Sequence, residues 1–141
     1  MLPLSLARRL AAAGLGWDPA PGDRFCIPDK GMDDEVFVLS TMTIEVHDLP
    51  GRTVLGFNGT TEWALDDVDK DAALWLPRED QLREHLGDAF RRLERAGDRW
   101  RVVATIWDEQ VEYVAADPDA AYAEALLHLL AAGPEIPGWP K

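Results

Sequence analysis

The residue pattern of 77–96, PREDQLREHLGDAFRRLERA, constrains the fold more than any other stretch of the chain. Large apolar side chains recur there at steps of four and three residues, at Leu82, Leu86, Phe90 and Leu93. This spacing is the period of an α-helix that buries one face. Pro77 suits the first helical position, Gly97 suits the position after the last, and arginines near the end complement the helix dipole. The sequence therefore predicts one continuous helix over 77–96 with a structural role.

Shorter patterns before and after this helix predict strands and two further helices. β-branched and aromatic residues predict strands at 24–27, 35–40, 43–47, 53–57, 100–107 and 110–115. The last two strands form a hairpin whose tight turn is expected at Asp108–Glu109. The amphipathic opening residues and the segment from Pro118 to Gly133 predict the other two helices. Residues 60–65 fit a helical turn and an extended segment equally well.

This order of elements, α-β-β-β-β-α-β-β-α, predicts the fold class. Short strands joined by short turns favour antiparallel pairing, and helices interspersed with them favour packing on a sheet. The expected fold is therefore α+β, a mostly antiparallel sheet with helices packed on it. With 141 residues the chain fits a single domain, expected over 1–133, followed by a Pro- and Gly-rich tail at 134–141.

Charge is the most unusual property of the composition, because 26 acidic residues against 14 basic ones give a net charge of −12. The stretch 29–71 concentrates this charge, with eleven carboxylates and three basic side chains, a net charge of −8. A field of this sign repels phosphate backbones, so no nucleic-acid partner is expected. It would attract a basic protein partner or simply keep the protein soluble, and both interpretations are open.

Hydrophobic runs and cysteine content predict a cytoplasmic protein that does not bind membranes. No apolar run approaches the length of about 20 residues that a membrane helix needs. Arg8 and Arg9 lie inside the first apolar stretch and not before it, unlike the charges of a secretion signal. The single cysteine, Cys26, excludes an internal disulfide and fits a reducing compartment.

Several motifs that would identify an enzyme are incomplete. None of the three lysines follows a glycine, so a phosphate-binding loop is excluded and no cofactor is expected. Asp67, Asp69 and Asp71 match the first three positions of a calcium loop, but Ala72 occupies the position of the required glycine. We interpret these aspartates as an acidic loop before the long helix.

The stretch Phe57–Trp63 differs most from structural sequence, because it combines a turn dipeptide, two hydroxyls, an acid and an indole. It is either a binding loop that faces an acidic loop at Asp33–Glu35, or a hairpin turn anchored by a tryptophan. The candidate interaction surface consists of Asp33, Asp34, Glu35, Asn58, Thr60, Glu62 and Trp63. Together with the charge of 29–71, it favours a non-enzymatic protein that acts through protein contacts. A homodimer is a further expectation, if Trp107 or Trp139 is exposed.

A second hypothesis is a small-ligand-binding protein, or a hydrolase that uses carboxylates with or without a divalent metal. Its residues would be Glu45, His47 and Glu62. Glu45 and His47 are two residues apart and supply oxygen and nitrogen ligands. The sequence places no regularly spaced third ligand beside them, so no metal is expected and this hypothesis ranks second.

Four segments of the chain resemble a group of small, acidic actinobacterial proteins that often carry the name pilus assembly protein CpaE. The segments are MDDEVFVLS, GFNGTTEWALD, LWLPREDQLREHLGDAF and AYAEALLHLL, and the resemblance covers most of the chain. The CpaE name implies a partner in the assembly of surface pili, related to ParA/MinD-type ATPases. The chain has no phosphate loop like that of these ATPases, so the resemblance carries over no functional residue.

Overall fold

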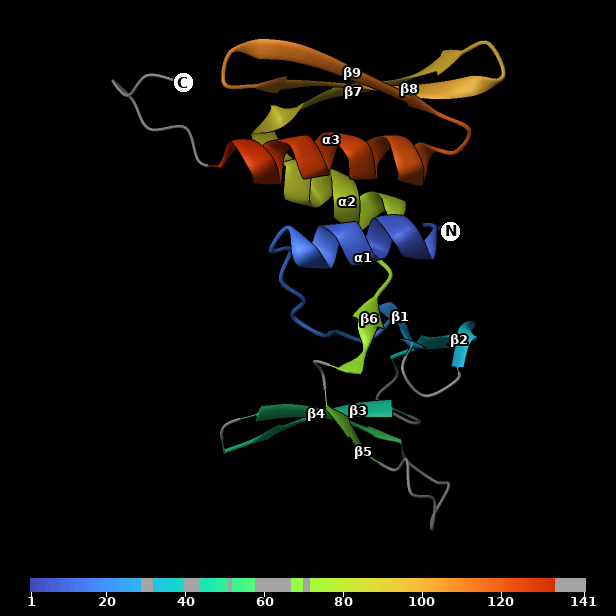
Figure 1. Cartoon of the computed structure of the whole chain (residues 1–141), viewed down its shortest axis with the longest axis vertical. Coiled ribbons are helices and arrows are strands. Elements are labelled where there is room, and N and C mark those ends of the chain that lie inside the picture. Colours follow the sequence, from blue (N-terminus) through green and yellow to red (C-terminus); the bar gives the residue numbers. More distant parts are fainter. Residues whose placement is uncertain (29–31, 40–43, 51, 58–66, 70–71, 134–141) are drawn as a thin grey trace. The chain divides into compact units, whose positions relative to one another are not determined.

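The computed structural model describes residues 1–28, 32–39, 44–50, 52–57, 67–69 and 72–133 (Figure 1). For 32–34, 44–49, 52–57 and 67–69 it describes the backbone alone. The chain divides into two compact units, one that combines Met1–Leu15 with Arg78–Lys141 and one that spans Gly16–Pro77. The predicted tail at 134–141 lies outside the described residues, and a single domain over 1–133 stays a prediction.

The fold class predicted from the sequence is confirmed. The described residues form an α+β fold whose strands pair antiparallel in three three-stranded sheets, with the orders β2–β1–β6, β3–β4–β5 and β7–β8–β9. The helices are α1 (Leu4–Ala12), α2 (Glu79–Leu86) and α3 (Pro118–Ala132). The strands are β1 (Arg24–Ile27), β2 (Met32–Val38), β3 (Ile44–Leu49), β4 (Arg52–Phe57), β5 (Asp67–Asp69), β6 (Leu74–Trp75), β7 (Phe90–Ala96), β8 (Arg99–Ile106) and β9 (Glu109–Ala115).

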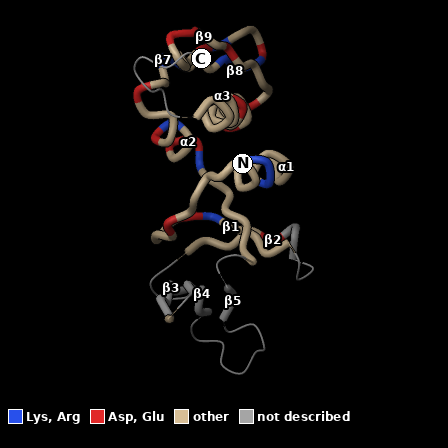
Figure 2. Tube along the Cα trace, turned by 60° about the vertical axis from the view of Figure 1, so that its left-hand side comes forward, with Lys and Arg blue, Asp and Glu red and all other residues tan. Residues whose placement is uncertain are grey.

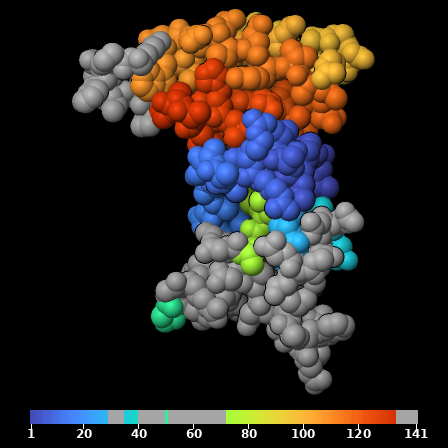
Figure 3. All heavy atoms as spheres, viewed as in Figure 1, coloured from blue at the N-terminus to red at the C-terminus, as the bar shows by residue number. Residues whose placement is uncertain are grey.

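The unit of Met1–Leu15 and Arg78–Lys141 places its helices on one face of the sheet β7–β8–β9 (Figure 1). Helix α3 packs on β8 and β9, and α1 and α2 pack on α3. Val102, Ala104 and Ile106 share one face of β8 and are buried, and Val103 on the other face is buried as well. In the space-filling view, the side chains of α3 (red) lie directly against those of the sheet (orange) (Figure 3). The hydrophobic core of this unit therefore lies between α3 and β8.

The continuous helix predicted over 77–96 is wrong, because the chain changes from helix to strand near Gly87. Helix α2 ends at Leu86, a 3₁₀ turn covers Gly87–Ala89, and β7 follows. Gly87 has φ 55° and ψ −130°, a combination that residues with a side chain rarely adopt. Beyond it, β7 pairs with β8 through seven residues that include Leu93 opposite Val102. This pairing outweighs the helical spacing of the sequence.

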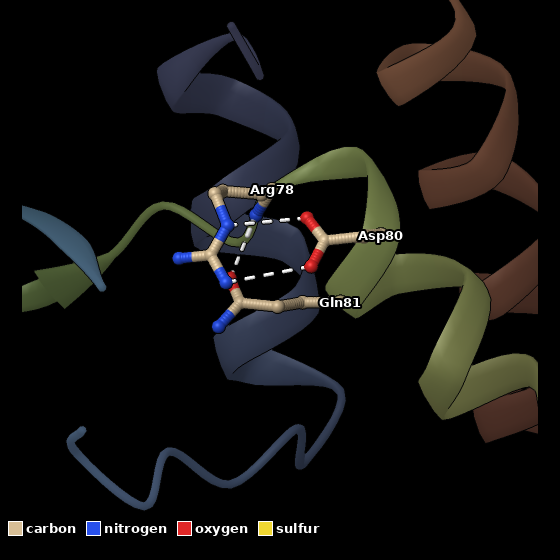
Figure 4. A network of polar contacts seen from close by, with 3 residues as sticks. All are labelled: Arg78, Asp80 and Gln81. Atoms are coloured by element: carbon tan, nitrogen blue, oxygen red, sulfur yellow. Dashed lines mark hydrogen bonds and ion pairs between the residues drawn. The ribbon is translucent and has the colours of Figure 1, made fainter. Parts of the chain in front are cut away.

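Helix α2 begins two residues after Pro77, and Arg78 precedes its first turn. The backbone N–H of Arg78 donates to Gln81 Oε1 at 2.9 Å, which satisfies the donor at the helix start (Figure 4). The guanidinium Nε of Arg78 donates to Asp80 Oδ1 at 3.1 Å. This hydrogen bond is the main cause that lowers the pKa of the Asp80 carboxyl. These contacts fix where the helix starts.

The unit Gly16–Pro77 has an aromatic core around β1. Phe25, Ile27 and Leu39 are buried, and Trp17 and Phe37 pack against them. The ring of Phe37, on β2, stacks on Phe25 with a centroid distance of 5.5 Å. Cys26, between Phe25 and Ile27, is completely buried. The sheet β2–β1–β6 is therefore built on large apolar contacts along one central strand.

A buried carboxylate stabilises the chain before β1. Asp23 is 3% exposed, and its Oδ2 accepts hydrogen bonds from Trp17 Nε1 at 2.9 Å and from the Ala20 backbone N–H at 3.0 Å. A buried charge costs free energy unless such partners compensate it. Asp23 thus ties the segment before β1 to the tryptophan that packs on the core.

Three local predictions are corrected. Asp33–Glu35 lies within β2 and not in a loop, and Asp67–Asp69 forms β5, which pairs with β4. The turn between β8 and β9 consists of Trp107 and Asp108, not of Asp108–Glu109, because Ile106 pairs with Glu109. Both turn residues have positive φ, 52° and 65°, as the two-residue hairpin turn that follows strand twist requires.

Candidate interaction surfaces

Strand β2 has an acidic sequence and exposes apolar side chains. It lies at the edge of the sheet β2–β1–β6, with Phe37 directed to the core side. Glu35 is exposed, and Val36 and Val38 are 39% and 51% exposed. These valines are two of the four large hydrophobic residues that are exposed in the described part of the chain. Such a strand combines backbone groups, apolar side chains and negative charge at one edge.

The structure brings together only part of the predicted interaction surface. Asp33, Asp34 and Glu35 follow one another on β2, and the side chain of Glu35 is described as exposed. The other four predicted residues lie outside the described residues, namely Asn58, Thr60, Glu62 and Trp63. Whether the stretch 57–63 faces β2 stays a prediction.

The residues of the second hypothesis lie partly on β3. Glu45 is opposite Gly56 and His47 is opposite Val54 in the pairing of β3 with β4. Glu62 lies outside the described residues. Among the side chains that the structure describes, no group of three histidines, cysteines, aspartates or glutamates is arranged to hold a metal ion. A metal or hydrolase site at Glu45, His47 and Glu62 stays a prediction.

Strand β7 carries three exposed arginines that the sequence interpretation assigned to a helix end. They are Arg91, Arg92 and Arg95, and β7 lies at the edge of the sheet β7–β8–β9. Figure 2 colours the basic positions along the backbone blue and the acidic positions red. Arg91 Nε donates to Thr105 Oγ1 at 3.1 Å, and the guanidinium of Arg95 lies 4.7 Å from the centre of the Trp100 ring. These contacts hold the arginines near the strand while the side chains stay exposed.

Glu94 links the arginines of β7 and β8. Arg101 Nη1 donates to Glu94 Oε1 at 3.0 Å and Arg92 Nε donates to Glu94 Oε2 at 3.1 Å. The hydrogen bond from Arg101, and then that from Arg92, lowers the pKa of the Glu94 carboxyl. Even with Glu94 included, β7 has a net charge of +2 in a protein of −12.

The sequence held one signal for this strand. Gly97 and Asp98 form a two-residue connection between Ala96 and Arg99, which pair with each other, and Gly97 has φ 67°. A Gly-Asp dipeptide between two strand-like runs is typical of a tight β-hairpin. Interpreting Gly97 as the residue after a helix end hides this hairpin signal.

A cavity of about 320 Å³ lies at the end of the sheet β7–β8–β9 where α3 ends. Its lining includes Asp88, Arg91, Trp107 and Asp108. The indole Nε1 of Trp107 donates to the carbonyl oxygen of Gly133 at 3.0 Å, so this tryptophan is half-buried and not the exposed dimer contact expected from the sequence. The volume is at the lower limit of small-molecule sites. The lining carries charges of both signs, which does not define one class of ligand.

A tyrosine and a histidine form a further polar pair between β9 and α3. The hydroxyl of Tyr113 and Nδ1 of His128 are 2.7 Å apart, and both side chains are half-buried. The hydroxyl and the ring nitrogen are hydrogen-bonded to each other, so their partial burial leaves neither of these atoms unpaired. The pair joins β9 to α3.

Comparisons of the chain with protein-family models, with curated proteins and with solved structures find no match. The resemblance to proteins named CpaE therefore stays a prediction. No helix among the described residues has the length and apolar character needed to cross a membrane.

Proposed function

We propose that this chain is a non-enzymatic protein that acts through protein contacts, and that its acidic strand β2 binds a basic segment of a partner. The observation that supports the proposal most is the position of β2 at a sheet edge with Val36 and Val38 exposed beside three consecutive acids. The proposal places this function in the cytoplasm, in agreement with a single buried thiol.

Charge supplies the attraction and the selectivity for a basic partner. The unit Gly16–Pro77 contains 13 acidic and four basic residues, a net charge of −9. The other unit contains 13 acidic and ten basic residues, a net charge of −3. Like the charged faces of other complexes, the first unit would speed the approach of a basic segment and repel an acidic one.

The edge strand supplies short-range binding. An extended partner segment that pairs with an edge strand gains backbone hydrogen bonds, while side-chain contacts determine which segment fits. Covering the half-exposed side chains of Val36 and Val38 would contribute about 1 kcal/mol each. A fitting segment therefore carries both basic and apolar residues.

The test is a binding titration with a fluorescent heptapeptide of alternating arginine and valine. At about 50 mM salt, where charges are weakly screened, we expect binding by the full chain that weakens steeply toward about 500 mM. The variant D33K/D34K/E35K should lose at least about 90% of this binding, because it reverses the charge beside the exposed valines.

A matched variant distinguishes a local site from general attraction. E84K/E109K/E112K reverses three exposed glutamates of the other unit and changes the net charge by the same amount. It should bind the peptide almost as well as the unmodified chain. Equal loss in both variants, or equal binding of an alternating glutamate–valine peptide, would contradict the proposal.

A further inference from the structure

We infer that the basic segment that β2 recognises is strand β7 of a second copy of this chain, so that the protein associates with itself through two edge strands of opposite charge. This inference rests on the proposed function and names the partner for the same site. The observation that carries it is that one chain holds both complementary edges.

The two strands match in length and position and are opposite in charge. Both β2 and β7 contain seven residues, and each is the first strand in the order of a three-stranded antiparallel sheet. β2 has the sequence MDDEVFV, with three carboxylates and no basic residue. β7 has the sequence FRRLERA, with three arginines and one glutamate. Antiparallel or parallel pairing of these edges would join a sheet of one copy to a sheet of the next.

The positive charge on β7 is exposed and is only partly neutralised within its own sheet. Glu94 is shared by Arg92 and Arg101, while the described contacts of Arg91 and Arg95 are to a hydroxyl, a carbonyl oxygen and an aromatic ring. Two of the three arginines of β7 thus have no carboxylate partner among the described residues. The carboxylates of β2 in a second copy would supply such partners.

Charged residues on edge strands often prevent sheets from joining edge to edge. Here the same charges would prevent β2 from pairing with β2 and β7 from pairing with β7, because like charges directly opposite one another are destabilising. They would not prevent the mixed pair. The shift of register between Phe90 and Arg92 interrupts the ladder near the start of β7, so the following residues offer the more regular edge.

A nucleic acid is the other macromolecule that an arginine-bearing strand can attract. The net charge of −12 opposes it, because most of the molecule would repel phosphates. Strand β2 of a second copy is favoured over it by charge and by backbone geometry.

The test is a charge exchange followed by sedimentation velocity on the full chain. At about 50 mM salt we expect a species larger than a monomer that dissociates by about 500 mM. D33K/D34K and R91E/R95E should each weaken self-association by about tenfold or more, since each creates like charges at the junction. R91E/R95E keeps Arg92, which holds Glu94 together with Arg101.

Mixing the two variants gives the decisive result. Equimolar D33K/D34K and R91E/R95E should form a heterologous complex, because their altered edges are again opposite in charge. This rescue also shows that both variants are folded. R8E/R9E, which reverses two exposed arginines on α1, is the matched control and should associate like the unmodified chain.

Three outcomes would overturn the inference. A monomer at about 50 mM salt that still binds the arginine–valine peptide would refute self-association and leave the proposed function intact. Self-association that the mixed variants fail to restore would show that other surfaces join the copies. Binding of a fluorescent single-stranded oligonucleotide that R91E/R95E abolishes would assign β7 to nucleic acid instead.

Discussion

Strands β2 and β7 are both seven-residue edge strands, yet they differ in almost every other respect. β2 is acidic and packs one face on an aromatic core through Phe37, whereas β7 is rich in arginine and reaches a helix through Phe90, whose ring lies 5.6 Å from that of Tyr122. The two units that contain them have net charges of −9 and −3. The comparison teaches that a strongly acidic protein can still present a local basic edge, which the overall charge conceals.

The largest expected effect is a loss of stability caused by a change in the core of the unit Gly16–Pro77. Replacing Phe25, which is completely buried, with alanine should cost about 3–5 kcal/mol, through lost transfer free energy and the cavity left behind. Urea unfolding measures the cost. Hydrogen exchange should show protection lost in β1 and β2 while β8 stays protected.

The matched change in the other region is Leu82→Ala, also at a completely buried position, with an expected cost of about 2–5 kcal/mol. Its hydrogen exchange should show the reverse distribution, with protection lost around α2 and retained in β1. If both variants lose protection equally throughout, the two units unfold as one, and the single domain predicted from the sequence would be the correct description.

A smaller loss of stability is expected from a change at Gly87, which lies between α2 and β7. Gly87→Ala should destabilise the protein by about 1–2 kcal/mol, because a side chain is strained at φ 55° although no atom lies within 4 Å of the added carbon. Thermal unfolding measures it. Gly16→Ala is the control, since that position also has open space but no positive φ. A stabilised Gly87→Ala would indicate that helix 77–96 is accessible after all.

The smallest effect concerns the electrostatic pattern of β7. The pKa of Glu94 is lowered from its ordinary value of 4.5 by Arg101 and then Arg92, so its ionised form stabilises the folded chain. This contribution is complete above that value and disappears as the pH falls through the lowered pKa. Melting temperatures of Glu94→Gln should therefore lie slightly below those of the unmodified chain near neutral pH and converge with them in acid.

The control for this comparison is Glu84→Gln on α2, an exposed glutamate of the same unit. Its melting temperature near neutral pH should stay close to that of the unmodified chain, because an exposed surface substitution of this kind has a small effect. A difference for Glu94→Gln that grows in acid would have the wrong sign for a lowered pKa and would contradict the role of the two arginines.

Local sequence predicted the elements whose signals agree with one another. β8 carries Val102, Ala104 and Ile106 on one buried face, and α3 has Pro118 at its first position, so both elements were predicted to within a residue or two. β7 was missed because Phe90 and Leu93 continue the helical spacing of Leu82 and Leu86. What decides the conformation of β7 is its pairing with β8, a contact that spacing within the segment does not contain.

The candidate surface was found only in part for a related reason. A run of acids such as Asp33–Glu35 is visible in any sequence, but its place on an edge strand beside exposed valines depends on the pairing of β1 with β2. The arginines of β7 are visible in the sequence as well. They were interpreted as complementing a helix dipole because the segment 77–96 was predicted to be helical. Charge is thus readable from sequence, while the edge that carries it is a property of the sheet.

The rate at which a reagent modifies the thiol of Cys26 measures how often β1 opens. It is the single thiol in 141 residues and is completely buried beside Phe25 and Ile27. A thiol reagent in excess will therefore modify the protein only as fast as the strand exposes this sulfur. The labelling rate, measured with and without a partner bound to β2, therefore shows how far binding at this edge strand reduces the exposure of the Cys26 thiol.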